Sequence, residues 1–342
     1  MRRATAFVKY AFFSVALFAI LVSPGLSAEK LPAAKAGQIG HPTGQIAFAR
    51  EKSVWVMNAD GTHQRLVTDV RNADGRMSWS PDNRKIAFTR SGTVDLRGPD
   101  MLGGRHKIYD IFIAFLDSAD ANPPNTNYWN RLTDDLGSRD PQWTKDNKII
   151  FWKDLNANLV NATEPNYQIV IMDADGSNVQ ILRKDWQNLS DFFTSPSIND
   201  NGDIAFVFFY SQRPQGLVVL PKAKIMMSPD SIKTLALKMP NCVAPAWSPD
   251  GKWLAYVRND INDPGIYIAT PDLSEKYVVF EPPVGASLYT VAPSFSPDSK
   301  WLTFATTDGS VWICDIAGGT PRRLTGPGVD AYPAWSQGTA SK

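Results

Sequence analysis

Five residues that could bind a ligand stand just ahead of the tryptophan that anchors a recurring phrase. They are Arg76, Arg139, Asp140, Asp330 and Tyr332, each at most five residues before an anchor Trp. Because carboxylate oxygens are the ligands that Ca²⁺ prefers, Asp140 and Asp330 could together hold this cation. The alternative is a water-filled channel with ordinary ion pairs, such as Arg139 with Asp330.

A second group of candidates is aromatic. Trp152 stands at the end of an apolar stretch, and Trp186, Phe192 and Phe193 follow in the next long loop. Exposed side chains of this kind could form the centre of an interface with a protein or peptide. The alternative is that they pack beneath their own loops.

Histidine and cysteine, which dominate metal and acid–base sites, are scarce in this sequence. His41, His63 and His106 are scattered, so we assign no catalytic residue and no metal ligand. Apart from the calcium alternative we expect no cofactor. Cys242 and Cys314 belong to different strand positions, and we expect two buried thiols even though export would permit a disulfide.

The first 28 residues have the pattern of a secretory signal peptide. Arg2, Arg3 and Lys9 precede an uncharged run, and a helix-breaking Pro24 with small residues follows it. The run is shorter than the roughly 20 residues that span a bilayer, so we expect cleavage and a periplasmic or secreted protein with no membrane span. Cleavage changes the net charge from +1 to about −2, which argues against nucleic acid as a partner.

One phrase recurs along the chain and predicts a repeat fold. Its fullest copies are 77–88, 244–256 and 292–304, with weaker copies at 140–151 and 195–206 and a partial copy at 332–336. Most copies follow one another at the spacing of a four-stranded propeller blade of about 40 to 50 residues. The anchors of the six copies are Trp79, Trp143, Ile198, Trp247, Phe295 and Trp335.

Each repeat divides into four short strands. A Ser-Pro-Asp turn follows the anchor strand, and a nearly continuous apolar strand such as 86–88 comes next, as expected where neighbouring blades cover both faces. Third strands such as 169–172 and fourth strands such as 131–133 complete the unit, and no helix is needed. The sequence therefore predicts an all-β fold of four-stranded antiparallel blades.

The two ends of the repeat region complement each other. Residues 44–68 supply three strands without an anchor strand, and 331–336 supply an anchor strand alone. Pairing the C-terminal strand with the N-terminal strands makes a sixth blade and closes the ring. We therefore expect a leader at 29–43, a monomeric six-bladed β-propeller at 44–338 and a tail at 339–342.

These repeats resemble those of the TolB family. The resemblance rests on Trp-Ser-Pro-Asp-Gly at 247–251, Lys-Ile-Ala-Phe at 85–88 and Asp-Ala-Asp-Gly at 173–176, and it covers about residues 44–336. It implies the TolB propeller without the α/β domain that precedes it in TolB, because only about 15 residues separate the signal from the first strand. The motifs are specific for the repeat and not for a function.

Loop lengths indicate which face of the propeller carries the function. In a propeller, the inter-blade loops and the connections from second to third strands emerge on one face, here called the loop face. The opposite side is the turn face. Long connections at about 91–106, 153–166 and 259–264, and a long inter-blade loop at 184–194, all belong to the loop face. A single large insertion, 117–128, belongs to the turn face.

We therefore expect the loop face to bind a partner, a protein or peptide of the cell envelope. The alternative is a propeller enzyme, such as a polysaccharide lyase or a lactonase. Its polar site would lie at the channel mouth, with Arg76, His106, Arg139, Asp140 and Asp330.

Overall fold

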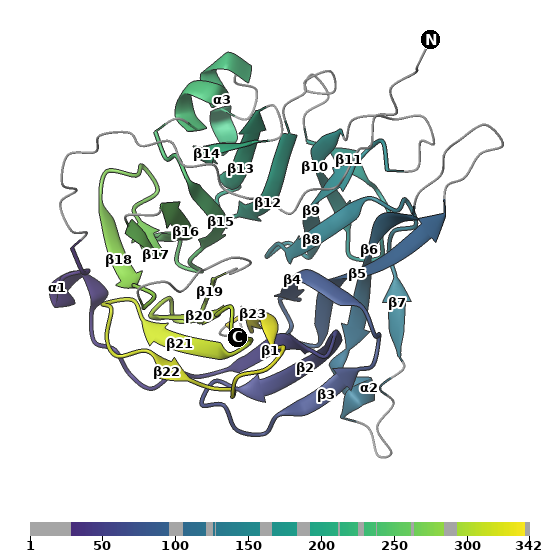
Figure 1. The fold of residues 1–342 in the computed structure, drawn as a ribbon, viewed down its shortest axis with the longest axis horizontal. Coiled ribbons are helices and arrows are strands. Elements are labelled where there is room, and N and C mark those ends of the chain that lie inside the picture. Colours follow the sequence, from purple (N-terminus) through teal and green to yellow (C-terminus); the bar gives the residue numbers. More distant parts are fainter. Residues whose placement is uncertain are drawn as a thin grey trace, which may run out of the picture.

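Six blades surround a central axis in the computed structural model of the chain (Figure 1). The structure describes residues 29–95, 105–120, 126, 128–157, 166–182, 192–210, 213–224, 229–236, 238–260, 263–283 and 293–338. The predicted signal peptide and C-terminal tail lie outside these residues. The predicted six-bladed all-β propeller is confirmed.

Each blade is an antiparallel sheet whose first strand is the innermost. Blade 1 consists of β23 (Ala331–Trp335), β1 (Gln45–Arg50), β2 (Ser53–Asn58) and β3 (Arg65–Thr68). Blade 2 consists of β4 (Ala73–Trp79), β5 (Lys85–Asp95), β6 (Arg105–Phe115) and β7 (Trp129–Arg131), and blade 3 of β8 (Ser138–Trp143), β9 (Lys148–Asp154), β10 (Tyr167–Asp173) and β11 (Gln180–Ile181). Blade 4 consists of β12 (Phe192–Ile198), β13 (Ile204–Tyr210) and β14 (Arg213–Leu220). Blade 5 consists of β15 (Cys242–Trp247), β16 (Leu254–Asp260), β17 (Asp263–Ala269) and β18 (Lys276–Phe280), and blade 6 of β19 (Ser294–Phe295), β20 (Trp301–Ala305), β21 (Val311–Asp315) and β22 (Arg322–Arg323).

The ring closes as the sequence predicts. Strand β23 pairs with β1, with Ala334 opposite Ala47 and Trp335 opposite Ile46. Figure 1 shows the yellow C-terminal strand beside the purple N-terminal strands. Since the last strand completes the first blade, neither of these strands leaves an open inner edge.

Blade 4 departs from the predicted four-strand pattern because a helix occupies the place of its outer strand. Helix α3 (Pro229–Ala236) packs on β14 and β13 with Ile232 and Ala236 fully buried. A Cβ at Gly216 of β14 would lie 2.3 Å from the Ala236 carbonyl oxygen, so this close approach requires glycine. The other helices are short: α1 (Ala33–Ala36), α2 (Leu116–Ala119) and the 3₁₀ turn η1 (Lys222–Lys224).

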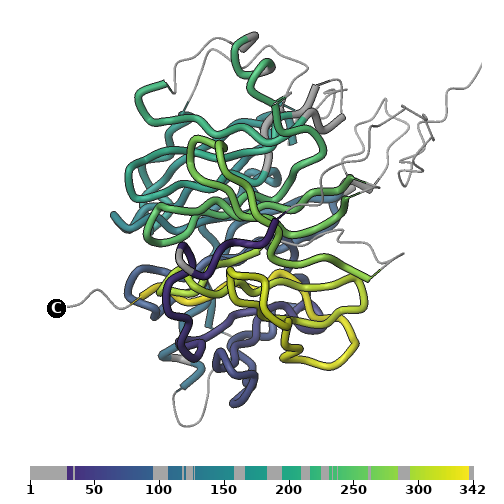
Figure 2. The backbone as a smooth tube through the Cα atoms, turned by 90° about the vertical axis from the view of Figure 1, so that its left-hand side faces the viewer, coloured from purple at the N-terminus to yellow at the C-terminus, as the bar shows by residue number. Residues whose placement is uncertain are grey.

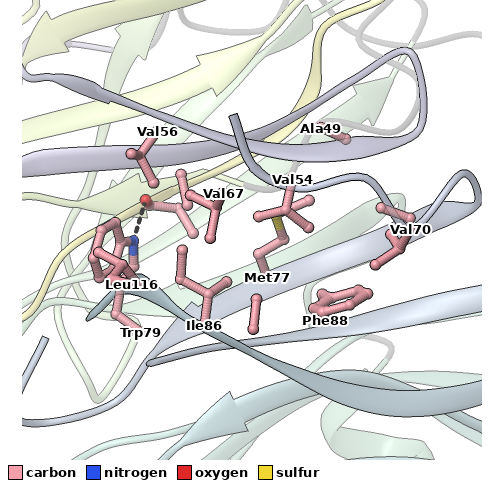
Figure 3. Packing of buried hydrophobic residues seen from close by; sticks show 14 of the residues in the cluster. Ala49, Val54, Val56, Val67, Val70, Met77, Trp79, Ile86, Phe88 and Leu116 are labelled. Carbon is pink, nitrogen blue, oxygen red and sulfur yellow. Dashed lines mark hydrogen bonds between the residues drawn. The ribbon is translucent and has the colours of Figure 1, made fainter. Parts of the chain in front are cut away.

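The core consists of layers between neighbouring blades. Six aromatic side chains occupy the same position in the second strands and are almost fully buried: Phe48, Phe88, Phe151, Phe206, Tyr256 and Phe304. Figure 3 shows one layer, in which Val54, Val56 and Val67 of blade 1 face Met77 and Ile86 of blade 2. Burying each such side chain contributes about 1.5–3 kcal/mol relative to exposure.

Hydrogen bonds between inner strands join the blades around the axis. A serine hydroxyl just before the anchor of one blade accepts a hydrogen bond from the backbone N–H of the anchor in the next blade. Ser78 Oγ accepts from Trp143 at 2.8 Å, and Ser294 Oγ accepts from Trp335 at 2.9 Å. Between blades 1 and 2, Trp79 Nε1 donates to the Ala334 carbonyl at 2.9 Å, the dashed line in Figure 3. These bonds fix the spacing of the inner strands.

The leader is part of the fold. Lys30 pairs with Val278 as a parallel bridge beside β18, and Leu31 is buried in the core of blades 5 and 6. Lys30 Nζ also donates to the Gly318 carbonyl of blade 6 at 2.6 Å. Figure 2 shows this purple segment lying against the green and yellow blades before it enters blade 1. In the part of the chain that the structure describes, no helix is long and apolar enough to cross a membrane.

Candidate functional site

Five of the six described inner strands carry β-bulges at their loop-face ends: β23, β4, β8, β12 and β15. In β8 the bulge places an extra residue between Arg139 and Gln142, and Asp140 within it has a positive φ of 52°. A bulge re-aims side chains and often marks the rim of a barrel or a site. Positive φ recurs in the bulges of the other described inner strands, at Gly75, Ser195, Ala244 and Tyr332.

Asp140 links blades 2 and 3 through both carboxylate oxygens. Oδ1 accepts the backbone N–H of Arg76 at 2.8 Å, and Oδ2 accepts the indole N–H of Trp152 at 2.8 Å. The backbone N–H of Asp140 donates to Thr89 Oγ1 at 2.9 Å. A Cβ at Gly75 would lie 2.4 Å from Oδ1, so the carboxylate fits only beside glycine. Asp140 is therefore buried in a hydrogen-bond network.

Asp330 belongs to a separate network. Its two oxygens accept Nε and Nη2 of Arg50, each at 2.8 Å, in a bidentate pair that raises the pKa of Arg50. The predicted ion pair of Arg139 with Asp330 is therefore wrong. The guanidinium of Arg139 lies instead over the rings of Tyr109, 3.8 Å from its centroid, and Trp152, at 4.9 Å. Stacking on two aromatic faces stabilises this cation without a carboxylate, while its Nε has no hydrogen-bond partner among the described residues.

These partners bear on the calcium and enzyme alternatives. Asp140 and Asp330 each use both oxygens in their own networks. No cluster of three or more His, Cys, Asp or Glu that could hold a metal ion occurs among the described residues. The side chain of His106 lies outside them. The calcium site and the enzyme both stay predictions, and no contact described here favours either.

Tyr332 connects blade 1 to blade 2 at the same rim. Its hydroxyl donates to Asp74 Oδ1 at 3.1 Å. Burial raises the pKa of this phenol, with a further contribution from the neighbouring charge of Asp74. The phenol is therefore protonated at neutral pH and acts as a donor.

The aromatic group predicted for partner binding is described only in part. Trp152 is 6 % exposed and packs edge-on against Tyr167 with ring centroids 4.7 Å apart, as the packing alternative expects. Phe192 and Phe193 lie in β12, but their side chains, and the whole of Trp186, are outside the described residues. The binding role of this group stays a prediction.

Arg76 reaches across the central axis. Its Nη2 donates to the Pro245 carbonyl oxygen at 2.6 Å, which joins β4 of blade 2 to β15 of blade 5. These two blades lie on opposite sides of the ring (Figure 1). Burial lowers the pKa of the guanidinium, which the charge of Asp140 partly offsets.

A cavity of about 800 Å³ lies beside Arg76 and reaches the turn face. Its walls include the last residues of the inner strands; the turns that follow these strands supply Lys145 and Asp200, and η1 supplies Lys222. The sequence indicated Arg76 as a channel residue but placed the ligand on the loop face. The sequence did not reveal the cavity because the turns that form its rim belong to the repeat and were interpreted as structural.

The comparisons with known proteins agree with this architecture. TolB from Acinetobacter baumannii superposes with a TM-score of 0.63 at 19 % identity, over 89 % of this chain and 70 % of that one. A putative TolB from Agrobacterium tumefaciens gives 0.55 at 13 % identity, over 87 % and 94 %. The sequence matches no protein-family model and no curated protein. The fold is that of a TolB-like six-bladed β-propeller.

Proposed function

We propose that this chain is an exported propeller that binds a protein or peptide of the cell envelope through its loop face. The fold it shares with TolB supports a binding scaffold, and the predicted signal peptide supports export. The observation that carries the proposal is the β5–β6 hairpin. Each of its strands has 11 residues, whereas the other strands in the described ranges have at most eight.

The hairpin extends the sheet of blade 2 on the loop face. Its pairing continues from Lys85 opposite Phe115 to Asp95 opposite Arg105, and Figure 1 shows the two strands running side by side at the right of the ring. Additional backbone bonds brace its middle, from Ser91 N–H to the Asn72 carbonyl and from Tyr109 N–H to the Leu136 carbonyl, both at 2.9 Å.

A braced arm suits binding because its groups are ordered before the partner arrives. Thr93 and Lys107 stand opposite each other in the register, and both are exposed. Fixing the backbone that carries these side chains in advance lowers the entropy that association costs. The predicted apolar part of the same surface is Trp186, between blades 3 and 4 in the sequence, with Phe192 and Phe193 at the start of β12.

Site-specific photocrosslinking tests this proposal in the host cell. A photoreactive amino acid at Thr93 or at Lys107 should crosslink to the same envelope protein. The matched controls are Lys145 and Val179, which are exposed on the turn face and should give no such product. Equal crosslinking from both faces, or none from the hairpin, would contradict the proposal.

The aromatic residues provide a second test. The double variant Trp186→Ala with Phe193→Ala should lose capture of that crosslinked partner while its melting temperature stays nearly unchanged. Undiminished capture would exclude these two side chains from the interface.

A further inference from the structure

The guanidinium of Arg76 is the charged group deepest in the central cavity, and we propose that it binds a carboxylate there. The other charged residues of the lining, such as Lys145, Asp146, Asp200 and Lys222, belong to the surrounding turns and η1. The cavity volume of about 800 Å³ is within the range of small-molecule sites. The site opens on the turn face and is independent of the partner surface proposed above.

The charge of Arg76 lacks a carboxylate partner. Among the described residues no salt bridge to Arg76 occurs, and the Pro245 carbonyl is the one acceptor of its side chain. Asp140 is close enough to affect the guanidinium electrostatically, but its two oxygens already accept the Arg76 backbone N–H and the Trp152 indole. A guanidinium has five N–H donors, so most of its donors remain for a ligand.

The position of Arg76 is fixed before any ligand binds. Asp140 holds its backbone N–H, and the Pro245 carbonyl holds Nη2 at the other end of the side chain. An arginine held at both ends loses little further freedom on binding. Its planar fork matches the two oxygens of a carboxylate, which makes such pairs about twice as strong as neutral hydrogen bonds.

Two of the tryptophans that line the cavity have indole N–H groups without an acceptor among the described residues. Trp143 and Trp247 line the cavity with 3 % and 7 % exposure, and neither indole N–H has an acceptor in the described structure. In contrast, Trp79 donates to the Ala334 carbonyl and Trp335 to the Thr43 carbonyl. These two N–H groups are buried and have no acceptor beside them in the described part of the chain, so their positive ends make the surroundings of the cavity more favourable for an anion than for a cation.

The remaining walls determine what the carboxylate is attached to. Side chains such as Met77, Ile198 and Phe295, together with several prolines, make much of the lining apolar. A carboxylate with a compact apolar body therefore fits better than a sugar acid with many hydroxyl groups. Such a group can come from a free small molecule or from an acidic side chain of a peptide.

The test compares a charged ligand with a neutral one of similar shape, and a free carboxylate with one carried by a peptide-like group. Benzoate, neutral benzamide and N-acetyl-glutamate N-methylamide are titrated into the mature protein by calorimetry. Benzoate or the blocked glutamate should bind at least about tenfold more tightly than benzamide, a difference set by the charge. Stronger binding of benzoate indicates a free ligand, and stronger binding of the blocked glutamate indicates a peptide side chain. The proposal would be overturned if neither benzoate nor the blocked glutamate bound more tightly than benzamide.

Substitutions test whether the affinity for the carboxylate depends on Arg76. Arg76→Gln should weaken binding of the tighter carboxylate at least about tenfold, whereas Arg323→Gln on the exposed outer strand β22 should leave it unchanged. The wild-type protein provides a readout that needs no stable variant: benzoate should shift the indole N–H NMR signals of Trp143 and Trp247 and not that of Trp312. Unchanged signals from both cavity tryptophans, or undiminished binding by Arg76→Gln, would exclude the site.

Discussion

The carboxylate of Asp140 on β8 accepts the indole N–H of Trp152 at 2.8 Å, and Trp152 lies on β9, the second strand of the same blade. Its other oxygen accepts the backbone N–H of Arg76 in the preceding blade. One buried side chain thus orients a tryptophan that was a candidate for partner binding and an arginine that lies beside the central cavity. A single hydrogen-bond network therefore includes both Trp152 at the loop-face rim and Arg76 beside the cavity.

Replacing Asp140 with Asn should destabilise the propeller. The amide retains one acceptor oxygen, and its NH₂ group would face either the Arg76 N–H or the Trp152 indole, leaving a buried donor without an acceptor. We expect a loss of about 1–3 kcal/mol in the free energy of unfolding, measured by denaturant titration. Asp134→Asn, at an exposed position before the same strand, is the matched control and should change stability little. Equal effects of the two substitutions would contradict the proposed role of Asp140.

The thiols of Cys242 and Cys314 should be unreactive in the native protein. Both residues are buried and unpaired, and burial raises the pKa of each thiol to about 12. At pH 8 a disulfide reagent should therefore modify neither thiol in buffer and both in guanidinium chloride. Rapid native modification of either one would show that its strand opens without global unfolding.

The same thiols make stability depend on alkaline pH. Between the ordinary thiol pKa of about 9 and the folded value of about 12, the native state binds more protons than the unfolded state, so stability falls as pH rises. Double substitution of both cysteines by alanine should flatten this fall, which thermal melts between pH 8 and pH 11 can measure. Parallel slopes in the two proteins would contradict the raised pKa values.

Sequence periodicity was sufficient to predict the ring because each blade repeats one physical requirement. An aromatic residue at the position of Phe88 or Phe151 must fill the space between two blades, and the Ser-Pro-Asp turns recur with it. The complementary ends of the repeat region likewise predicted the pairing of β23 with β1. Local pattern and global fold agree here.

The site was harder to predict because its contacts join residues that no motif connects. Asp330 pairs with Arg50, which is 280 positions away, whereas the sequence predicted a pair with Arg139. Arg76 meets Pro245 through a backbone carbonyl, which has no signature in the sequence. Helix α3 was missed for the same reason, since Ile232 gains its burial from β14 and not from a local repeat.

The leader should contribute to stability through Leu31. This side chain is 3 % exposed and packs in the same cluster as Trp253 and Tyr277 of blade 5. Leu31→Ala should therefore lower the free energy of unfolding by about 2–4 kcal/mol. Ile39→Ala, on the same segment but only partly buried, is the control and should cost less. A negligible effect of Leu31→Ala would mean that the leader is not docked in solution.

Helix α3 should be sensitive to a single methyl group on the strand beneath it. A Cβ at Gly216 would lie 2.3 Å from the Ala236 carbonyl oxygen and 2.4 Å from that of Met239, both of which are backbone atoms that cannot rotate away. Gly216→Ala should therefore separate the helix from β14 and expose Ile232, with increased hydrogen exchange in residues 229–236 before global unfolding. Gly251→Ala, whose Cβ would meet no atom within 4 Å but whose φ is also positive, separates the effect of the clash from that of backbone strain. If both variants lose similar stability and exchange in 229–236 stays slow, strain alone accounts for the glycine at position 216, and the helix does not depend on the close approach.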